Sequence, residues 1–381
     1  MKYKIFLNEP SIAKNEVKYL KECVKKKQIS VGSFLSKFEK KICSITKSKY
    51  STVVCSGSSA LHIALIANNI KKNEIVIAPS FTFVSTINAI NNINAKPWFL
   101  DISLKDLNLD LDLLEKTLKK DTYIKKGFTF HKKTKSKVSA IIVVYSFGLM
   151  LDMTRLLSIV KKYNLKLIAD AACAIGSSYH GKNIGEFRNI TSIVSFNGNK
   201  IVTTGAGGAL LSNNKKIIDL AKYYSSNARA KSSYEYNDFG FNYRMANINA
   251  AVGLAQLEKI DKFMKKKKFI YDFYKKNLKI KKNFRFFPSN LNCKSTHWFS
   301  GVIFDNNKVL QEYIKIFLRK KIEAKVFWKP LHLQKIYKKS LKTNMKNTNY
   351  VWDKIFTLPS GTSLSFSTVK RISRYFNNIK K

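Results

Sequence analysis

Short apolar runs alternate with amphipathic helical patterns between about residues 51 and 213. The helical patterns cover residues 59–69 and 154–163, and the apolar runs cover residues 53–54, 74–78, 97–101, 140–145 and 166–170. Apolar runs separated by helices of this length predict right-handed strand–helix–strand crossovers, and therefore a mostly parallel sheet flanked by helices. A ligand of such a sheet binds at the carboxyl ends of its strands.

The hydrophobic pattern changes after residue 249. Apolar side chains recur at helical spacing from Ala250 to Phe263, which predicts one long amphipathic helix. A highly charged stretch and a mixed αβ region follow up to Lys381. We therefore expect a large domain over residues 1–260, in which the residues up to about Gln28 form an N-terminal arm or packing helix. A smaller αβ domain is expected over residues 261–381.

Membrane, secretion and metal signals are weak in this chain. No stretch reaches the roughly 18 unbroken apolar residues of a membrane helix, and the start MKYKIFLNEP does not resemble a signal peptide. The five cysteines are widely spaced and form no CxxC pair. We therefore expect neither a disulfide framework nor a zinc site, no membrane partner, and a cytoplasmic location.

The net charge of +46 would by itself suggest a nucleic-acid or membrane partner. However, only eight of the 70 basic residues are arginines, the residue type that reads phosphates and bases specifically. The lysines form short runs such as 25–27 and 265–268. Charge runs usually mark solvated faces, so we expect a lysine-rich surface without a specific nucleic-acid site.

Asp170 ends an apolar run and is followed by small residues, AACAIG. An acid at the carboxyl end of a strand faces the ligand crevice, and pyridoxal phosphate needs a carboxylate beside its ring nitrogen. The alternative is an ordinary helix N-cap, for which Asp is also favoured. The pattern alone leaves both open.

Lys200 follows thirty residues later in SFNGNK, before the glycine-rich stretch IVTTGAGG at residues 201–208. A lysine sheltered between apolar pieces can lose its proton and attack an aldehyde. Most of the 62 lysines are expected on the surface, and only its neighbours distinguish Lys200.

Phosphate binding is expected where Gly57, Ser58 and Ser59 open a helix, because free backbone N–H groups and the helix dipole attract anions. Ser195 offers a further hydroxyl. Ordinary capping would explain the same residues. Phe83 follows a strand and could stack on a flat ring, although an aromatic residue there is more often part of the core.

Five ordered motifs resemble the DegT-type nucleotide-sugar aminotransferases, a family of pyridoxal-phosphate enzymes of fold type I. They are GSSALH, PSFTF, DAACAIG, SFNGNK, and GFNYRM running into NAAVGLAQL. The resemblance covers nearly the whole chain. The segment WKPLH at residues 328–332 adds a likeness to the perosamine-synthase and legionaminic-acid-pathway branch.

The resemblance implies an α/β fold, a homodimer with shared active sites, and pyridoxal 5'-phosphate as the cofactor. By position, Lys200 would bind the cofactor aldehyde, Asp170 its ring nitrogen and Phe83 its flat face. Phosphate ligands would be Gly57, Ser58, Ser59 and Ser195, with Asn242 of the partner subunit. The implied reaction transfers an amino group, from glutamate, to a 4-keto-6-deoxy hexose linked to a nucleotide, for surface-polysaccharide or glycan synthesis.

Other positions depart from the family or carry looser expectations. Cys173 stands where the family usually has Gln, Glu or His near the cofactor, and a thiol is a weaker hydrogen-bond partner. Candidate substrate contacts are Arg229, Arg244, Trp328 and His332, and the two arginines could hold a diphosphate by charge-assisted bonds.

Two rival functions remain. A sugar dehydratase of the same family uses the same cofactor but has His at the lysine position, so Lys200 argues against it. A non-catalytic regulatory or nucleic-acid-binding protein would keep the fold for its charge. No helix-turn-helix signature supports that second rival, and the catalytic set is intact.

Overall fold

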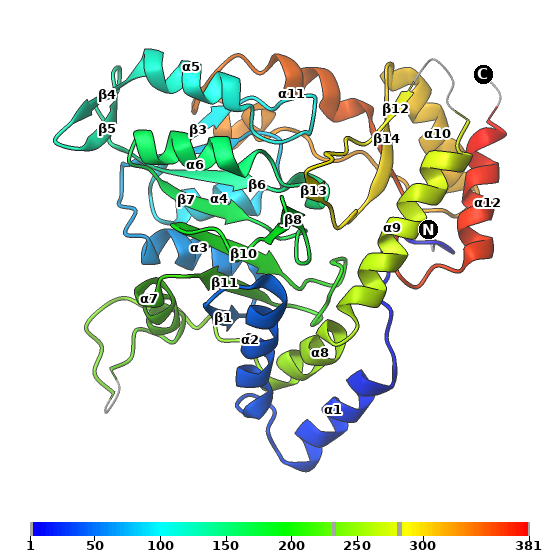
Figure 1. Cartoon of the computed structure of the whole chain (residues 1–381), viewed down its shortest axis with the longest axis horizontal. Coiled ribbons are helices and arrows are strands. Elements are labelled where there is room, and N and C mark those ends of the chain that lie inside the picture. Colours follow the sequence, from blue (N-terminus) through cyan, green and yellow to red (C-terminus); the bar gives the residue numbers. More distant parts are fainter. Residues whose placement is uncertain (1–2, 231–233, 280–283, 380–381) are drawn as a thin grey trace.

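An eight-stranded sheet forms the centre of the molecule (Figure 1). The computed structural model describes residues 3–230, 234–279 and 284–379. The strand order is β1 (Tyr50–Val54), β11 (Gly208–Ser212), β10 (Ile190–Ser195), β7 (Lys166–Asp170), β6 (Val138–Val144), β2 (Ile75–Pro79), β3 (Lys96–Leu100) and β15 (Leu341–Lys342). Neighbours from β10 to β15 are parallel, whereas β11 is antiparallel to β10 and β1. The expected mostly parallel sheet is confirmed.

Helices cover both faces of this sheet, because side chains along a strand point alternately to its two sides. On β6, Ile141 and Val143 join one hydrophobic cluster, and Ala140 and Ile142 join the other. The first cluster includes buried residues of α2 (Ser33–Thr46), α5 (Leu111–Asp121) and α6 (Met153–Lys162). The second includes buried residues of α3 (Gly57–Ala67), α4 (Ser85–Asn92) and α7 (Lys215–Ser225).

The long helix expected after residue 249 is two helices, α8 (Asn247–Leu257) and α9 (Ile260–Asn277). The N-terminal helix α1 (Lys14–Lys25) packs against α8. Its Glu16 accepts a hydrogen bond of 2.9 Å from Lys259 at the break, and Tyr19 donates one of 2.7 Å to Glu258. These contacts join α1 to the residues between α8 and α9, and α9 continues in a new direction (Figure 1). Periodicity alone does not reveal such a break.

A second unit is built on the antiparallel sheet β12 (Phe284–Phe286), β14 (Ser300–Phe304) and β16 (Ile355–Leu358). Its core includes buried residues of α9, α10 (Asn307–Arg319) and α12 (Phe366–Asn377). Ile5 also belongs to this core and pairs with Ile322, so the segment around Ile5 lies in the second unit. In return, β15 joins the large sheet. A segment before the expected boundary at residue 260 therefore packs in the second unit, and a segment after it packs in the large unit.

The remaining elements are short. They are the hairpin β4 (Thr122–Lys125) and β5 (Phe128–His131), the small sheet β13 (Cys293–Lys294), β8 (Ser178–Tyr179) and β9 (Lys182–Asn183), the helix α11 (Lys346–Val351), and the 3-10 turns η1 (Ser146–Gly148), η2 (Leu331–Leu333), η3 (Lys335–Tyr337) and η4 (Trp352–Lys354). Across the described residues, no helix is both long enough and apolar enough to span a membrane.

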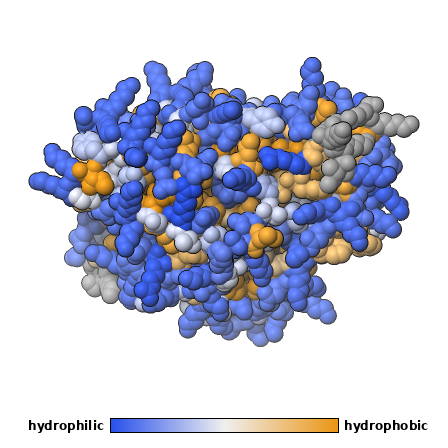
Figure 2. All heavy atoms as spheres, turned by 45° about the horizontal axis from the view of Figure 1, so that its top comes forward, coloured by the Kyte–Doolittle hydropathy of each residue, from blue (hydrophilic) through white to orange (hydrophobic). Residues whose placement is uncertain are grey.

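Hydrophilic side chains cover most of the face seen in Figure 2, as expected for a lysine-rich surface. One lysine of the run 265–268 is a clear exception. The side chain of Lys267 is 1% exposed, so the expectation that this run is solvated is wrong at that position. The helical period explains the difference, because Lys267 shares the buried face of α9 with Phe263, Met264 and Ile270.

Candidate active site

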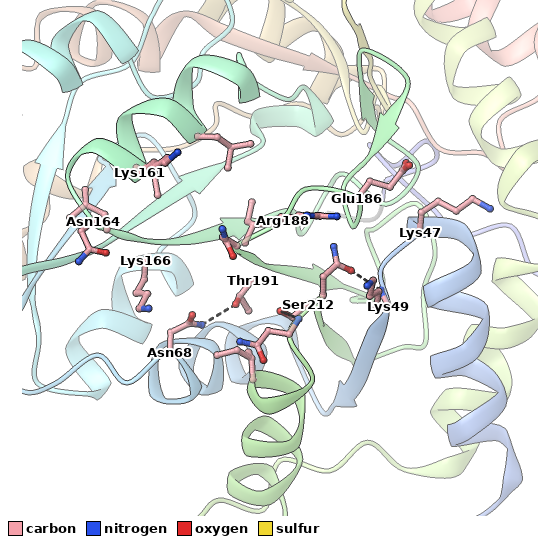
Figure 3. A pocket seen from close by; sticks show the side chains of 18 residues that line it. Lys47, Lys49, Asn68, Lys161, Asn164, Lys166, Glu186, Arg188, Thr191 and Ser212 are labelled. Atoms are coloured by element: carbon pink, nitrogen blue, oxygen red, sulfur yellow. Dashed lines mark hydrogen bonds between the residues drawn. The ribbon is translucent and has the colours of Figure 1, made fainter. Parts of the chain in front are cut away.

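Two large pockets lie at opposite ends of the strands of the central sheet. The first, of about 870 Å³, lies where β7 and β10 begin, and Figure 3 shows Lys161, Lys166 and Arg188 around it. Asn68 and Lys161 mark the ends of α3 and α6 there, so cations in this pocket face the negative ends of helix dipoles. No cysteine, histidine or serine–base pair lines it, and it carries no catalytic group of the kinds expected from the sequence.

The second pocket, of about 580 Å³, lies where β6, β7 and β10 end. Its lining includes the last residues of these strands, Val144, Asp170 and Ser195. Gly57, Ser58, Phe83, Cys173, Lys200 and Trp328 also line it. These residues come from segments far apart in the chain, and the parallel sheet brings them to one edge. This pocket is the candidate active site.

Asp170 is buried at the carboxyl end of β7. Its Oδ2 accepts a hydrogen bond of 2.7 Å from Thr86 Oγ1, and its Oδ1 accepts one of 3.2 Å from the Ala172 N–H. Burial raises the pKa of the Asp170 carboxyl, whereas the Thr86 and Ala172 bonds and the charge of Lys200 oppose that rise. The chain after Asp170 runs through turns to β8, so the helix-cap alternative is not supported.

Lys200 lies on the turn after β10 and is half-buried. Its Nζ donates a hydrogen bond of 3.2 Å to Cys173 Sγ and lies 4.3 Å from the ring centroid of Trp298. Burial raises the pKa of the Cys173 thiol, so this group is a neutral partner at neutral pH. The amine is therefore held inside the pocket by a soft acceptor and an aromatic face, close enough to Asp170 to affect its pKa.

The start of α3 forms a cradle suited to a phosphate. Ser56 is the N-cap, and its Oγ accepts a hydrogen bond of 3.0 Å from the Ser59 N–H. This cap starts the helix at Gly57, two residues before the expected position at 59. A Cβ atom on Gly57 would lie 2.9 Å from Cβ of Ser195, so only glycine allows this close approach of α3 to β10. The free N–H groups of the first helical turn can bind an anion there.

The hydroxyl groups around this cradle differ in their availability. Ser56 and Ser58 line the pocket, and Ser58 Oγ donates to Ser85 Oγ at 2.7 Å. The Ser59 hydroxyl instead contacts Ser56 Oγ at 2.8 Å and Cys55 Sγ at 3.2 Å, and Ser59 does not line the pocket. Sequence reasoning missed Ser56, although a serine directly before a Gly-Ser-Ser turn is an N-cap signal.

Aromatic side chains form one wall of the pocket. The rings of Trp328 and Phe147 are stacked with centroids 5.6 Å apart and planes 8° apart. Trp298 stacks on Trp328 at 6.4 Å, with an interplanar angle of 17°. Phe83 lines the pocket with 57% of its surface exposed, so the alternative that it is a core residue is excluded. Thr86, Phe147 and Trp298 were not found from the sequence, because no local pattern marks them.

Three predicted residues lie outside this pocket on the chain between α7 and α8. Asn242 is exposed, and its backbone pairs with that of Ser226. Arg229 is exposed with its guanidinium 4.1 Å from the ring centroid of Tyr234, and Arg244 is exposed beside Val54. Within one chain the structure therefore does not bring these three side chains to the pocket.

His332 is also outside the pocket. It is buried, with Nδ1 2.6 Å from Ser80 Oγ and Nε2 2.9 Å from Asn349 Oδ1. Both ring nitrogens are occupied by these contacts, so the expected substrate contact by His332 is not supported. The ring instead links η2 to the end of β2 and to α11.

The residues of the pocket fit pyridoxal phosphate. An amine, a buried carboxylate, an anion cradle and an exposed phenyl ring meet around one cavity, as this cofactor requires. Among the described residues, no group of three or more His, Cys, Asp or Glu side chains is arranged to hold a metal ion.

Comparisons with known proteins agree with this geometry. Residues 10–377 match the DegT/DnrJ/EryC1/StrS aminotransferase family. The chain is 32% identical to a GDP-perosamine synthase of Escherichia coli O157:H7, over 99% of this chain and 98% of the relative. It is 30% identical to the UDP-4-amino-4,6-dideoxy-N-acetyl-beta-L-altrosamine transaminase of Campylobacter jejuni subsp. jejuni serotype O:23/36 (strain 81-176), over 96% and 95%.

Solved structures share the fold. The aminotransferase PseC of Helicobacter pylori, involved in the biosynthesis of pseudoaminic acid, superposes with a TM-score of 0.88 at 24% identity, covering 99% of this chain and 98% of that chain. A Streptococcus pneumoniae protein solved in its PLP-form superposes with a TM-score of 0.87 at 21% identity, covering 99% and 98%. The expected α/β fold of the pyridoxal-phosphate aminotransferases is confirmed.

Proposed function

Because the chain belongs to the DegT/DnrJ/EryC1/StrS aminotransferase family, we propose that it transfers an amino group from an amino acid, glutamate, to the keto carbon of a nucleotide-linked sugar. The observation that carries the proposal is the meeting of Lys200, Asp170 and the α3 cradle in one pocket. Relatives that cover almost the whole chain are named for GDP- and UDP-linked amino sugars, which supports a keto-sugar nucleotide as the acceptor.

The cofactor is pyridoxal 5'-phosphate, which supplies an aldehyde for covalent attachment and a ring that takes up the electrons released at the substrate carbon. Lys200 Nζ would hold the aldehyde in the resting enzyme. Gly57 and Ser58 on α3 and the Ser195 hydroxyl would bind the phosphate, and Phe83 would cover one face of the ring.

Lys200 would also move the proton. When it is not bound to the cofactor aldehyde, its amine would take the proton from the amino-bearing carbon of the substrate and deliver it to the former aldehyde carbon of the cofactor, across the transferred nitrogen. Asp170 would keep the ring nitrogen protonated, and the Thr86 hydrogen bond favours the carboxylate form that this role needs. The aromatic wall of Phe147, Trp298 and Trp328 would exclude water during the transfer.

We also propose a homodimer with shared active sites, in which the partner subunit contributes Asn242. The described residues 226–230 and 234–246, between α7 and α8, include a segment that extends away from the body of the protein (Figure 1). It exposes 97% of Phe239 and 81% of Tyr234, and exposed apolar side chains of this size favour a protein interface. In such a dimer Arg229 or Arg244 would approach the partner's pocket and hold the substrate diphosphate. Lys325, which lines the pocket in its own chain, is a further cation for that role.

Two further expectations remain part of this proposal. The reaction would take place in the cytoplasm, in keeping with five cysteines that are all free. The rival dehydratase function is disfavoured because that branch has His where this chain has Lys200. The rival nucleic-acid function would require sequence-selective binding, since affinity that falls steeply with salt would report only the bulk charge.

Turnover of a panel of keto-sugar nucleotides tests the proposal. Each of UDP-, GDP- and dTDP-linked 4-keto-6-deoxy sugars is incubated with isotope-labelled glutamate, and mass spectrometry follows the label into the sugar. At least one sugar should take up the label. Lys200→Ala should abolish the transfer, and Lys216→Ala, at an exposed position of α7, should leave it unchanged.

Borohydride reduction gives an independent readout. In the wild type it should attach the cofactor irreversibly to the peptide that contains Lys200. An adduct on another lysine, or full transfer by Lys200→Ala, would refute the assignment.

A further inference from the structure

Lys267 is a buried lysine on α9 without a role in the proposed chemistry. Its Nζ donates hydrogen bonds of 3.0 Å to Asn8 Oδ1 and 2.8 Å to the Trp298 main-chain oxygen. Both acceptors are neutral. Burial of a charge is costly unless it is paired, and desolvation lowers the pKa of Lys267 to about 7. A well-packed apolar side chain would avoid this cost, so the amine at this position calls for an explanation.

The two groups that Lys267 holds converge on one atom. The side-chain amide of Asn8 and the indole Nε1 of Trp298 both donate to the main-chain oxygen of Asn199, the indole at 2.7 Å. Asn199 directly precedes Lys200. The network therefore links one buried amine, through two separate donors, to the backbone that carries Lys200.

The same network shapes the surroundings of the Lys200 amine. The Trp298 ring lies under Lys200 Nζ, at 4.3 Å from centroid to nitrogen. Trp298 is almost fully buried and lies between Lys267 and the pocket, with its main chain held by one lysine and its ring facing the other. A shift of Trp298 would therefore change both the backbone of Asn199 and the contact with Lys200.

We propose that Lys267 is a positioning residue of the active site, which fixes Trp298 and Asn8 and through them the location of Lys200. Distant parts of the chain meet here, because Lys267 is 259 residues from Asn8 and Trp298 is 99 residues from Asn199. The N-terminal segment, α9 and the turn after β10 are thereby tied together at one point. The proposal rests on Lys200 being the cofactor lysine.

The alternative is that Lys267 only stabilises the packing between the two units. A merely structural role predicts lower stability with unchanged chemistry in the folded fraction. A positioning role predicts a change at Lys200 itself. The two are separated by Lys267→Met, which keeps an unbranched side chain, shorter by the nitrogen atom, and removes its donors. Lys265→Met, at an exposed position on the same helix, is the matched control.

The first measurement needs no cofactor. The cofactor-free protein is treated with a limiting amine-reactive reagent, and peptide mass spectrometry gives the labelling rate of Lys200 between pH 6 and pH 10. Lys267→Met should label Lys200 several-fold faster than the wild type, because the amine is no longer held against Trp298. Lys265→Met should match the wild type.

The second measurement uses the loaded enzyme. The rate of a single half-reaction with glutamate should fall about ten- to a hundredfold in Lys267→Met, the range expected when a reacting group is displaced by up to roughly 1 Å. The KM for glutamate should change little. Asn8→Ala removes one of the two donors to Asn199 and should give a smaller loss in the same direction, which provides the test if Lys267→Met does not fold.

Folded Lys267→Met with wild-type labelling and wild-type half-reaction rates would overturn the proposal. The same outcome for Asn8→Ala would do so if only that variant folds. A wild type that shows no adduct on Lys200 and no amino transfer would instead refute the proposed function. The two failures are therefore distinguishable.

Discussion

The hydroxyl of Thr86 donates a hydrogen bond of 2.7 Å to Oδ2 of Asp170, and so connects the first turn of α4 to the end of β7. Both side chains are buried. The bond favours the ionised carboxyl in a place where burial favours the neutral one. Thr86 thus belongs to the machinery that keeps Asp170 charged, although it does not itself line the pocket.

Replacing Thr86 by valine should move the acidic limb of the activity profile to higher pH. Removal of the hydrogen bond raises the pKa of Asp170 further, so the carboxylate is lost at a higher pH as the solution is acidified. The half-reaction with glutamate, followed by cofactor absorbance against pH, measures this shift. Thr117→Val, at a buried threonine of α5, should leave the profile in place.

Asp170→Asn sets the upper limit for that effect, because an amide cannot hold the ring nitrogen protonated. We expect the proton transfer to slow by at least about 10²- to 10³-fold, the cost of losing one interaction with developing charge. Thr86→Val should lose less. A near-normal rate in Asp170→Asn would show that this carboxyl has no role in the chemistry.

Mixing two inactive variants tests whether Asn242 acts across the dimer. Lys200→Ala and Asn242→Asp, which sets a carboxylate against the phosphate, should each be nearly inactive alone. After subunit exchange, one site of a mixed dimer collects both lesions and the other has none, so activity should return towards half the wild-type value per dimer. If exchange is demonstrated and the mixture stays inactive, Asn242 does not act in the partner's site.

The stability of the wild type relative to Lys267→Met should rise between pH 7 and about pH 10. Burial lowers the pKa of Lys267 to about 7, whereas the unfolded chain keeps the ordinary value of 10.5. Between these values the unfolded state binds more protons, so the free energy of unfolding increases with pH, by at most about 1.4 kcal/mol per unit. Below pH 7 Lys267 is protonated in both the folded and the unfolded state, so the full cost of burying its charge lowers the stability of the folded protein.

Urea unfolding of both proteins across this range measures the difference. Cys173 also faces Lys267, and a thiolate formed there above its own raised pKa would raise the pKa of Lys267, so thiol alkylation follows the titration of Cys173 in parallel. A difference in stability that does not change with pH would contradict the lowered pKa.

Many strands and helices of the large unit could be predicted from the sequence, because buried side chains recur with the period of the strand or helix that carries them. The apolar run at 166–170 is β7, and the run at 140–145 differs from β6 by two residues at its start and one at its end. Asp170 and Gly57 could be predicted because they stand at a strand end and a helix start, and Lys200 because it lies between an apolar run and a glycine-rich turn. A parallel sheet brings such ends to one edge whatever the details of packing.

The sequence by itself determined the family and the sheet and indicated Lys200, Asp170 and Gly57, since these depend on local pattern and on short motifs. Only the tertiary structure decided which polar side chains meet. His332 belongs to a recognisable motif yet is enclosed by Ser80 and Asn349, and Lys267 belongs to a charge run yet lies beneath the active site. Hydrogen bonds between residues more than 200 positions apart follow from how the units pack, and no local period encodes that packing.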